Sequence, residues 1–403
     1  MSDTDFQRRL DLHLDDLQRA FDREDLDRAA HALAALQALD PAAALLGRAR
    51  VAAWKEDWHG VLRTLAAVQG APNVLRGPMV RLITSALAET GRPGQAEQVV
   101  QAWLAENPAD LEAVICLGRV WLRSGRLEQA HLILLQVLEQ LPGNGEASAI
   151  LGQVHLLRGE IEPALDSLRR ACAAQPMSAR PVLSLAQAWL LSGRPAEGAR
   201  EVAARAGALG ERIEPGVLLA LATLQLQAGL DTPVPSVLRR IESGGEPGHG
   251  LRISLARLWA ELGVPVEIER LAAASPSPGV AALLRALAQE AQGNDPLPDL
   301  DEAAARVPEA WLVHERRAAV LLARNDLAGA EAAIAEACRR APTKGEVRVT
   351  AAIVALAGAR IGGSAVDRRA ARDVLRMAAD HPALLRSLRA RAHDALVHDE
   401  AQP

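Results

Sequence analysis

The residues of this chain best suited to chemistry are its histidines, cysteines and acidic side chains. Their spacing in the sequence matches no known catalytic or metal-binding motif. The ten histidines are scattered without the short intervals typical of metal ligands. The three cysteines, Cys116, Cys172 and Cys338, lie far apart and form no C-x-x-C pair. The sequence also lacks a phosphate-binding loop, a nucleophile elbow, and the zinc-protease and dinucleotide fingerprints. We therefore expect a non-enzymatic protein with no metal and no cofactor.

Charge, hydropathy and cysteine content indicate which partners and which cellular compartment to expect. The formal net charge of −5 is small for 403 residues, so we expect no binding of nucleic acid. The first residues carry charges and no apolar run, and no segment has 18 uninterrupted apolar residues, so we expect neither a signal peptide nor a membrane span. An odd number of separated cysteines favours a reducing compartment. Together these features predict a cytoplasmic protein.

The elements that position these residues follow a repeat of 34 residues. Pro108 and Gly125 return as Pro142 and Gly159, each 34 positions later. A period in this range is typical of a solenoid built from helical hairpins. Hydrophobic residues make up 49 % of the chain but aromatic residues only 2 %, a composition that favours helices over strands. The fold class predicted is all-α.

The repeat extends over nearly the whole chain, with one irregular stretch. Turn-forming residues at 275–279 interrupt the register, so we predict an N-terminal superhelix over 1–276 and a second part over 277–403 that holds an irregular repeat and further repeats. This break is a candidate hinge. We also predict a glycine-rich turn at 358–364 and a charged capping helix at 382–398.

Small residues at fixed positions set the distance between the two helices of each hairpin. Gly118 and Gly152 are expected where the helices approach most closely, so a larger side chain there would cost about 1–3 kcal/mol. Gly125 and Gly159 are expected between the helices, in the left-handed conformation that ends the first of them.

These positions resemble the tetratricopeptide repeat family, in the form found in bacterial proteins with many repeats. The strongest match covers 108–211, where small residues, glycine, alanine and proline recur in step. The resemblance implies a right-handed superhelix of about eleven helix-turn-helix repeats, closed by the capping helix. It also implies a concave groove that binds a protein or peptide, either as a helix or as an extended segment.

In this family the second, fifth, ninth, twelfth and thirteenth residues of each first helix line the groove. In the three central repeats seven of these fifteen positions are leucines, beside a row of amide and hydroxyl groups, which would suit the apolar face of a partner helix. Four arginines upstream, Arg50, Arg81, Arg119 and Arg123, are expected at groove positions as well. The predicted partner-binding residues are Gln153, Leu156, Leu157, Leu183, Gln187, Leu190, Leu191, Leu219, Thr223, Leu226, Arg119 and Arg123.

Other interpretations of these residues remain open. The leucines could be core between repeats, or could be covered by a second copy of the chain in a homo-oligomer. The groove arginines are about as frequent as arginine is in the whole chain, so a basic stripe is not indicated. The sequence predicts a protein-binding scaffold, with a peptide-responsive regulator or an accessory subunit of a biosynthetic or secretion complex as the alternatives.

Overall fold

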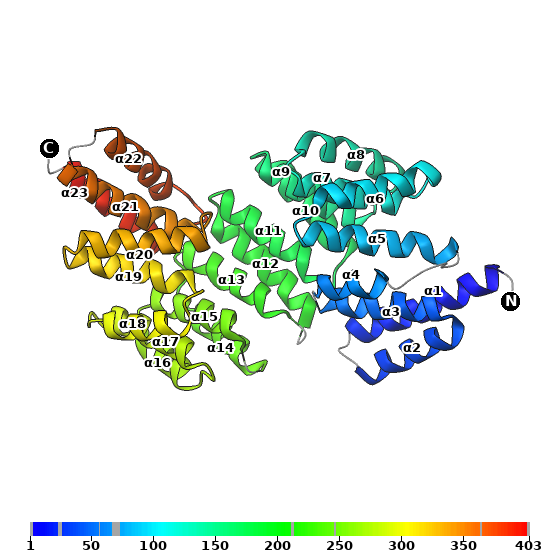
Figure 1. The fold of residues 1–403 in the computed structure, drawn as a ribbon, viewed down its shortest axis with the longest axis horizontal. Coiled ribbons are helices and arrows are strands. Elements are labelled where there is room, and N and C mark those ends of the chain that lie inside the picture. The colour runs from blue at the N-terminus through cyan, green and yellow to red at the C-terminus, as the bar shows by residue number, and fades with distance from the viewer. Residues whose placement is uncertain are drawn as a thin grey trace. The chain divides into compact units, whose positions relative to one another are not determined.

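The computed structural model describes residues 3–22, 26–55, 57–66, 73–210, 213–245, 247–362 and 365–400. Every regular element in these ranges is a helix (Figure 1). Their bounds are α1 Asp3–Asp22, α2 Leu26–Leu39, α3 Pro41–Trp54, α4 Trp58–Ala66, α5 Asn73–Glu89, α6 Pro93–Glu106, α7 Leu111–Arg123, α8 Leu127–Gln140, α9 Gly145–Leu157, α10 Ile161–Ala174, α11 Ala179–Leu191, α12 Pro195–Leu209, α13 Pro215–Gln227, α14 Val234–Ser243, α15 His249–Glu261, α16 Pro265–Ala273, α17 Pro278–Ala291, α18 Leu297–Arg306, α19 Trp311–Ala323, α20 Leu327–Arg340, α21 Gly345–Gly362, α22 Ala365–Ala379 and α23 Arg386–Glu400.

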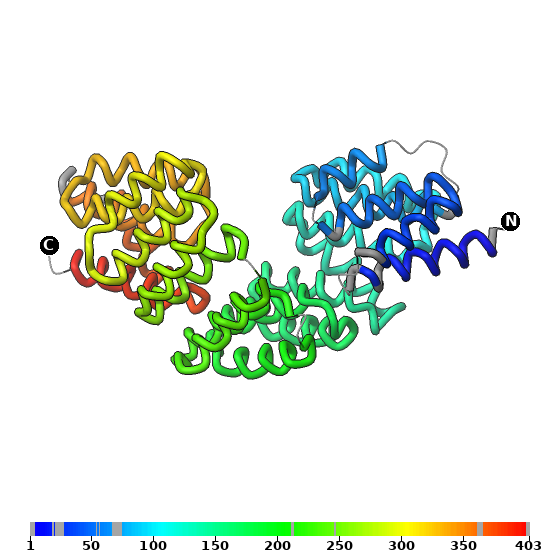
Figure 2. Tube along the Cα trace, turned by 90° about the horizontal axis from the view of Figure 1, so that it is seen from below, coloured from blue at the N-terminus to red at the C-terminus, as the bar shows by residue number. Residues whose placement is uncertain are grey.

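Consecutive helices pack as hairpins, so the described residues form eleven helix pairs followed by α23. This confirms the predicted all-α repeat solenoid with a closing C-terminal helix. The odd-numbered helix of each pair is called the first helix below. The chain divides into two compact units, unit 1 over Met1–Gln175 and unit 2 over Pro176–Pro403, and hairpin follows hairpin within each (Figure 2). The boundary that the sequence predicts after residue 276 differs from this division at 175 and stays a prediction.

The turn inside most hairpins uses a residue with positive φ. Gly125 and Gly159 have φ values of 72° and 76°, as the sequence predicts. Asn325 takes this role in the α19–α20 turn, with a φ of 62°. Asparagine is one of the few non-glycine residues that tolerate this region, which explains how the repeat keeps its turn without a glycine.

The close approach of the two helices is visible at the predicted glycines. A Cβ atom on Gly152 would lie 2.6 Å from Cγ of Leu168, and one on Gly118 would lie 3.0 Å from Cγ of Leu134. Both leucines are fully buried. A side chain at Gly152 would therefore collide with the hydrophobic core of its hairpin, and one at Gly118 would require Leu134 to shift slightly.

Two local predictions differ from the structure. The glycine-rich turn expected at 358–364 is wrong over 358–362, because α21 continues to Gly362; 363 and 364 lie outside the described residues. The capping helix starts later than predicted, at Arg386 rather than 382. Among the described residues, none of the helices has the length and apolar character needed to cross a membrane.

Candidate functional site

The candidate site of each unit is the side formed by the groove positions of its first helices, called the first-helix face below. In unit 1, α9 contributes Gln153, Leu156 and Leu157. Gln153 is exposed, Leu156 is half-buried and Leu157 is 64 % exposed. By contrast Leu151 of the same helix is buried, so α9 presents two of its leucines outward.

In unit 2, the predicted residues of α11 also remain accessible. Gln187 is exposed, while Leu183, Leu190 and Leu191 are half-buried. The adjacent α13 behaves differently at one position.

Thr223 and Leu219 of α13 are half-buried, and the Thr223 hydroxyl donates to the carbonyl oxygen of Leu219 at 2.8 Å. Leu226 is only 1 % exposed and lies in the core. Leu226 is therefore not available to a partner in this structure, because its neighbours already cover it.

The two predicted arginines belong to a row of ion pairs between neighbouring first helices of unit 1. Arg119 of α7 pairs with Glu146 of α9 and donates to the Ser85 hydroxyl at 3.2 Å. Arg123 pairs with Glu89 of α5. Carboxylates thus offset both charges, and the arginines join one repeat to the next.

The histidines and cysteines considered above have structural surroundings. His155 is 8 % exposed, with Nδ1 2.5 Å from a carboxylate oxygen of Glu160 and its ring edge against His131. Cys116 and Cys172 are buried, and burial raises the pKa of the Cys116 thiol. A thiol held in its neutral form is a poor nucleophile.

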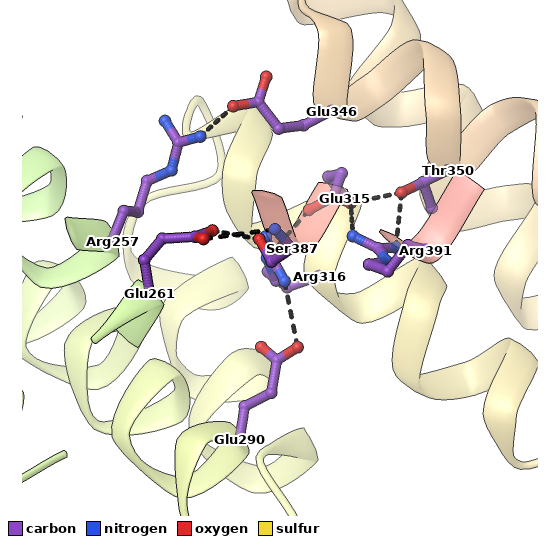
Figure 3. Close-up of polar contacts among 9 residues, drawn as sticks. All are labelled: Arg257, Glu261, Glu290, Glu315, Arg316, Glu346, Thr350, Ser387 and Arg391. Carbon is purple, nitrogen blue, oxygen red and sulfur yellow. Dashed lines mark hydrogen bonds and ion pairs between the residues drawn. The ribbon is translucent and has the colours of Figure 1, made fainter. Parts of the chain in front are cut away.

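A polar cluster on the first-helix face of unit 2 was not named by the sequence interpretation. Figure 3 shows that it joins four first helices to the start of α23. Arg257 of α15 pairs with Glu346 of α21, and the backbone N–H of Ser387 in α23 donates to Glu261 of α15 at 3.3 Å. The Ser387 hydroxyl donates to the same carboxylate.

At the centre of this cluster Glu315 is fully buried. Nε of Arg316 lies 3.1 Å from one of its carboxylate oxygens, and Nη1 of Arg391 donates to the other at 3.3 Å. Thr350 donates its hydroxyl to Glu315 and accepts from Arg391 at 2.9 Å. Burial acts to raise the pKa of Glu315, but the charges of Arg316 and Arg391 outweigh it, so the pKa is lowered and the carboxylate stays ionised.

A cavity of about 190 Å³ lies between these helices and α23. Its wall includes Arg257, Glu261, Glu290 and Arg316 from the repeats, and Leu385 and Leu388 from the C-terminal segment. Arg316 also donates to Glu290 at 3.1 Å. The C-terminal segment therefore lies against the first-helix face of unit 2.

A signal for the cluster was present in the sequence. Arg257 and Glu261 are the ninth and thirteenth residues of α15, Glu315 is the fifth of α19, and Glu346 is the second of α21. These are groove positions by the same rule that selected the central leucines. Applied to the later repeats, the rule would have named these residues, although not their contacts with α23.

Models of the tetratricopeptide repeat match two stretches of the chain, residues 87–154 and 297–344. One stretch lies in each unit, and the second covers the α18–α20 region that follows the irregular stretch. These two stretches of the chain are therefore tetratricopeptide repeats. Proteins of this class generally serve as non-enzymatic scaffolds for protein–protein interaction.

Solved structures similar to this chain include several repeat proteins of low identity. A thermophilic tetratricopeptide repeat protein from Thermus thermophilus is 22 % identical, with a TM-score of 0.38 over 44 % of this chain and 96 % of its own. A tetratricopeptide repeat protein from Parabacteroides merdae is 16 % identical, with a TM-score of 0.41 over 60 % and 97 %. The Cut9–Hcn1 hetero-tetramer of APC/C is 14 % identical, with a TM-score of 0.45 over 84 % of this chain and 59 % of its own. No curated protein matches the sequence.

Proposed function

We propose that the chain is a non-enzymatic scaffold that holds a helix or an extended segment of a partner protein against its first-helix faces. The observation that carries this proposal is the accessible row of leucines beside exposed amides. Leu157 is 64 % exposed next to Gln153 in unit 1, and Leu190 and Leu191 stay half-exposed next to Gln187 in unit 2. Apolar side chains flanked by amides suit the apolar face of a partner helix.

The ion pairs of unit 1 indicate that its partner is recognised by apolar contacts rather than by charge. Because Arg119 and Arg123 are already paired with Glu146 and Glu89, that face has little net charge to offer. Partner recognition there would depend on apolar contact and amide hydrogen bonds rather than on charge, so its affinity should change little with salt concentration.

Affinity capture from the native lysate tests the proposal. Wild-type chain is compared with a Leu157→Glu, Leu191→Glu double variant, and bound proteins are identified by mass spectrometry. We expect a partner that is retained by the wild type and lost by the variant, because each carboxylate would enter the apolar contact without a counter-charge.

The matched control is Leu132→Glu on α8, a second helix, where the leucine is 61 % exposed. It introduces one carboxylate at an exposure similar to that of Leu157, away from the first-helix face. A partner lost equally by both variants, or retained by both, would contradict the proposal. Circular dichroism of the variants confirms that the helices are intact.

A peptide-responsive regulator is the second candidate, favoured by the C-terminal segment of unit 2. Side chains of α23 bond to α13, α15, α19 and α21, and Gln227 of α13 donates to the backbone carbonyl of Leu384 in the preceding loop. This face therefore already holds a segment of the chain itself. A face that is occupied in the free chain can respond to a competing ligand by releasing that segment.

A further inference from the structure

The start of α23 is bound to the first-helix face of unit 2 through an edge of arginines. Arg386 pairs with Asp231 in the loop that follows α13, Arg389 donates to Gln227 at 2.7 Å, and Arg391 donates to Glu315 at 3.3 Å. These three residues are called the arginine edge. Gln227 returns a hydrogen bond of 2.6 Å to the carbonyl oxygen of Leu384. Contacts thus run from α13 to α19 along residues 384–391.

Charge complementarity explains why this segment lies there. The receiving face presents five carboxylates to the cavity or to α23, offset by only two arginines, Arg257 and Arg316. Residues 386–391 contain three arginines and no acidic residue. The carboxylates are Asp231, Glu261, Glu290, Glu315 and Glu346. The face is therefore acidic by three charges before the arginine edge is added, and the edge balances it.

An apolar contact accompanies the charges. Leu388 lies between the arginines and is 4 % exposed, packed in one core cluster with Val349 and Leu375 of α21 and α22. Asp399, near the other end of α23, is buried and bonded to arginines of α21 and α22. The far end of α23 therefore has anchoring contacts of its own, apart from those of the arginine edge.

We propose that this acidic face is a recognition site for an arginine-bearing helix of a partner protein, and that the first turns of α23 occupy it in the free chain. The inference rests on the proposed scaffold function and names the chemistry of one partner. The matching helix carries arginines at the spacing of 386, 389 and 391 with a leucine between them. It would displace the arginine edge, while Asp399 keeps the end of α23 in place.

A peptide with the sequence of residues 381–400 serves as the probe, labelled for fluorescence anisotropy. It is titrated into the full-length wild type and into a full-length variant with Arg386→Ala, Leu388→Ala and Arg389→Ala, which weakens the resident segment. Arg391 is left in place because Glu315 is buried against it. We expect the variant to bind the peptide about tenfold more tightly or better, since the resident segment competes less.

Two controls locate the site. Asp231→Asn and Glu261→Gln, added to the weakened variant, should abolish this gain. A peptide with its three leading arginines replaced by glutamate should not bind. Equal binding of the peptide to wild type and variant, binding of the glutamate peptide, or no binding at all would overturn the proposal. A doubled mass of the variant in light scattering would also overturn the proposal, because a second copy of the chain would then occupy the acidic face.

If the triple variant does not fold, Arg386→Ala alone carries the test, because this side chain is 38 % exposed and its removal leaves the core intact. A gain of severalfold is then expected, and its absence overturns the proposal. The outcome is distinct from that of the capture experiment. A chain that loses its partner on Leu157→Glu, Leu191→Glu but never binds the peptide retains the scaffold function and loses this inference.

Discussion

Gln227 Nε2 donates a hydrogen bond of 2.6 Å to the carbonyl oxygen of Leu384, which lies 157 residues further along the chain. The carbonyl oxygen of the same Gln227 side chain accepts from Arg389 at 2.7 Å. In a solenoid each repeat ordinarily contacts only its neighbours. One glutamine of the second repeat of unit 2 is here bound by the C-terminal segment, so this unit contains a contact that no single repeat specifies.

Gly152→Ala tests the close approach of the hairpin helices. Its Cβ would lie 2.6 Å from Leu168 Cγ, so we expect the free energy of unfolding to fall by about 1–3 kcal/mol relative to the control. The control is Gly94→Ala, which also lies in a helix but has no atom within 4 Å of its new Cβ. Both changes gain helix propensity, and the gain is larger at the interior position 152, so a loss of stability there reflects packing. Denaturant titrations that show no difference would contradict the close packing.

Gly159→Ala tests the left-handed turn between α9 and α10. The φ of 76° costs a residue with a Cβ about 1–2 kcal/mol, although space is available around it. Gly159→Asn should cost less, because Asn325 adopts this conformation in the α19–α20 turn. Thermal and denaturant unfolding should show stability decreasing in the order glycine, asparagine, alanine at position 159. An alanine variant as stable as the asparagine variant would refute the argument.

Glu315→Gln tests the buried centre of the unit 2 cluster. The substitution keeps the shape but removes the charge that compensates Arg316 and Arg391, so we expect a loss of about 3–5 kcal/mol. Glu197→Gln is the matched control, since this carboxylate is 47 % exposed and its pair with Arg194 spans 3.7 Å. The control should change stability by about 0–1 kcal/mol. Similar losses for both variants would show that burial of Glu315 adds nothing.

Asp399 gives unit 2 a defined pH dependence. Burial acts to raise its pKa, but hydrogen bonds from Arg368, Arg360 and Arg372 lower the pKa to about 2, below the ordinary value of 3.8. The ionised carboxylate therefore stabilises the folded chain. This contribution is present above about pH 4 and is lost as the pH falls to about 2.

The variant Asp399→Asn should be less stable than wild type at pH 6, and the difference should shrink to nothing as the pH approaches 2. Unfolding midpoints measured across this range check the prediction. Asp373→Asn in α22, where the carboxylate is 57 % exposed, is the control and should leave the pH profile unchanged. A difference between wild type and Asp399→Asn that does not vary with pH would contradict the ionic role of Asp399.

The sequence by itself determined the repeat architecture, because a helical hairpin is specified locally. Gly125 and Gly159 need only their own backbone conformation, and Gly152 needs only the leucine of its partner helix. The 34-residue step then places the first helices side by side. The turn between the two helices and their close approach are each encoded within one repeat, and the 34-residue period repeats them. The structure has these features at the residues where the sequence predicts them.

The tertiary structure alone decided which side chains of the first helices are available. Leu190 and Leu226 occupy the same position in successive first helices, yet the first is half-exposed and the second is buried. The position of α23 was likewise beyond the sequence pattern. Whether Leu384 reaches Gln227 depends on small rotations summed over several repeats, and no single repeat contains that sum.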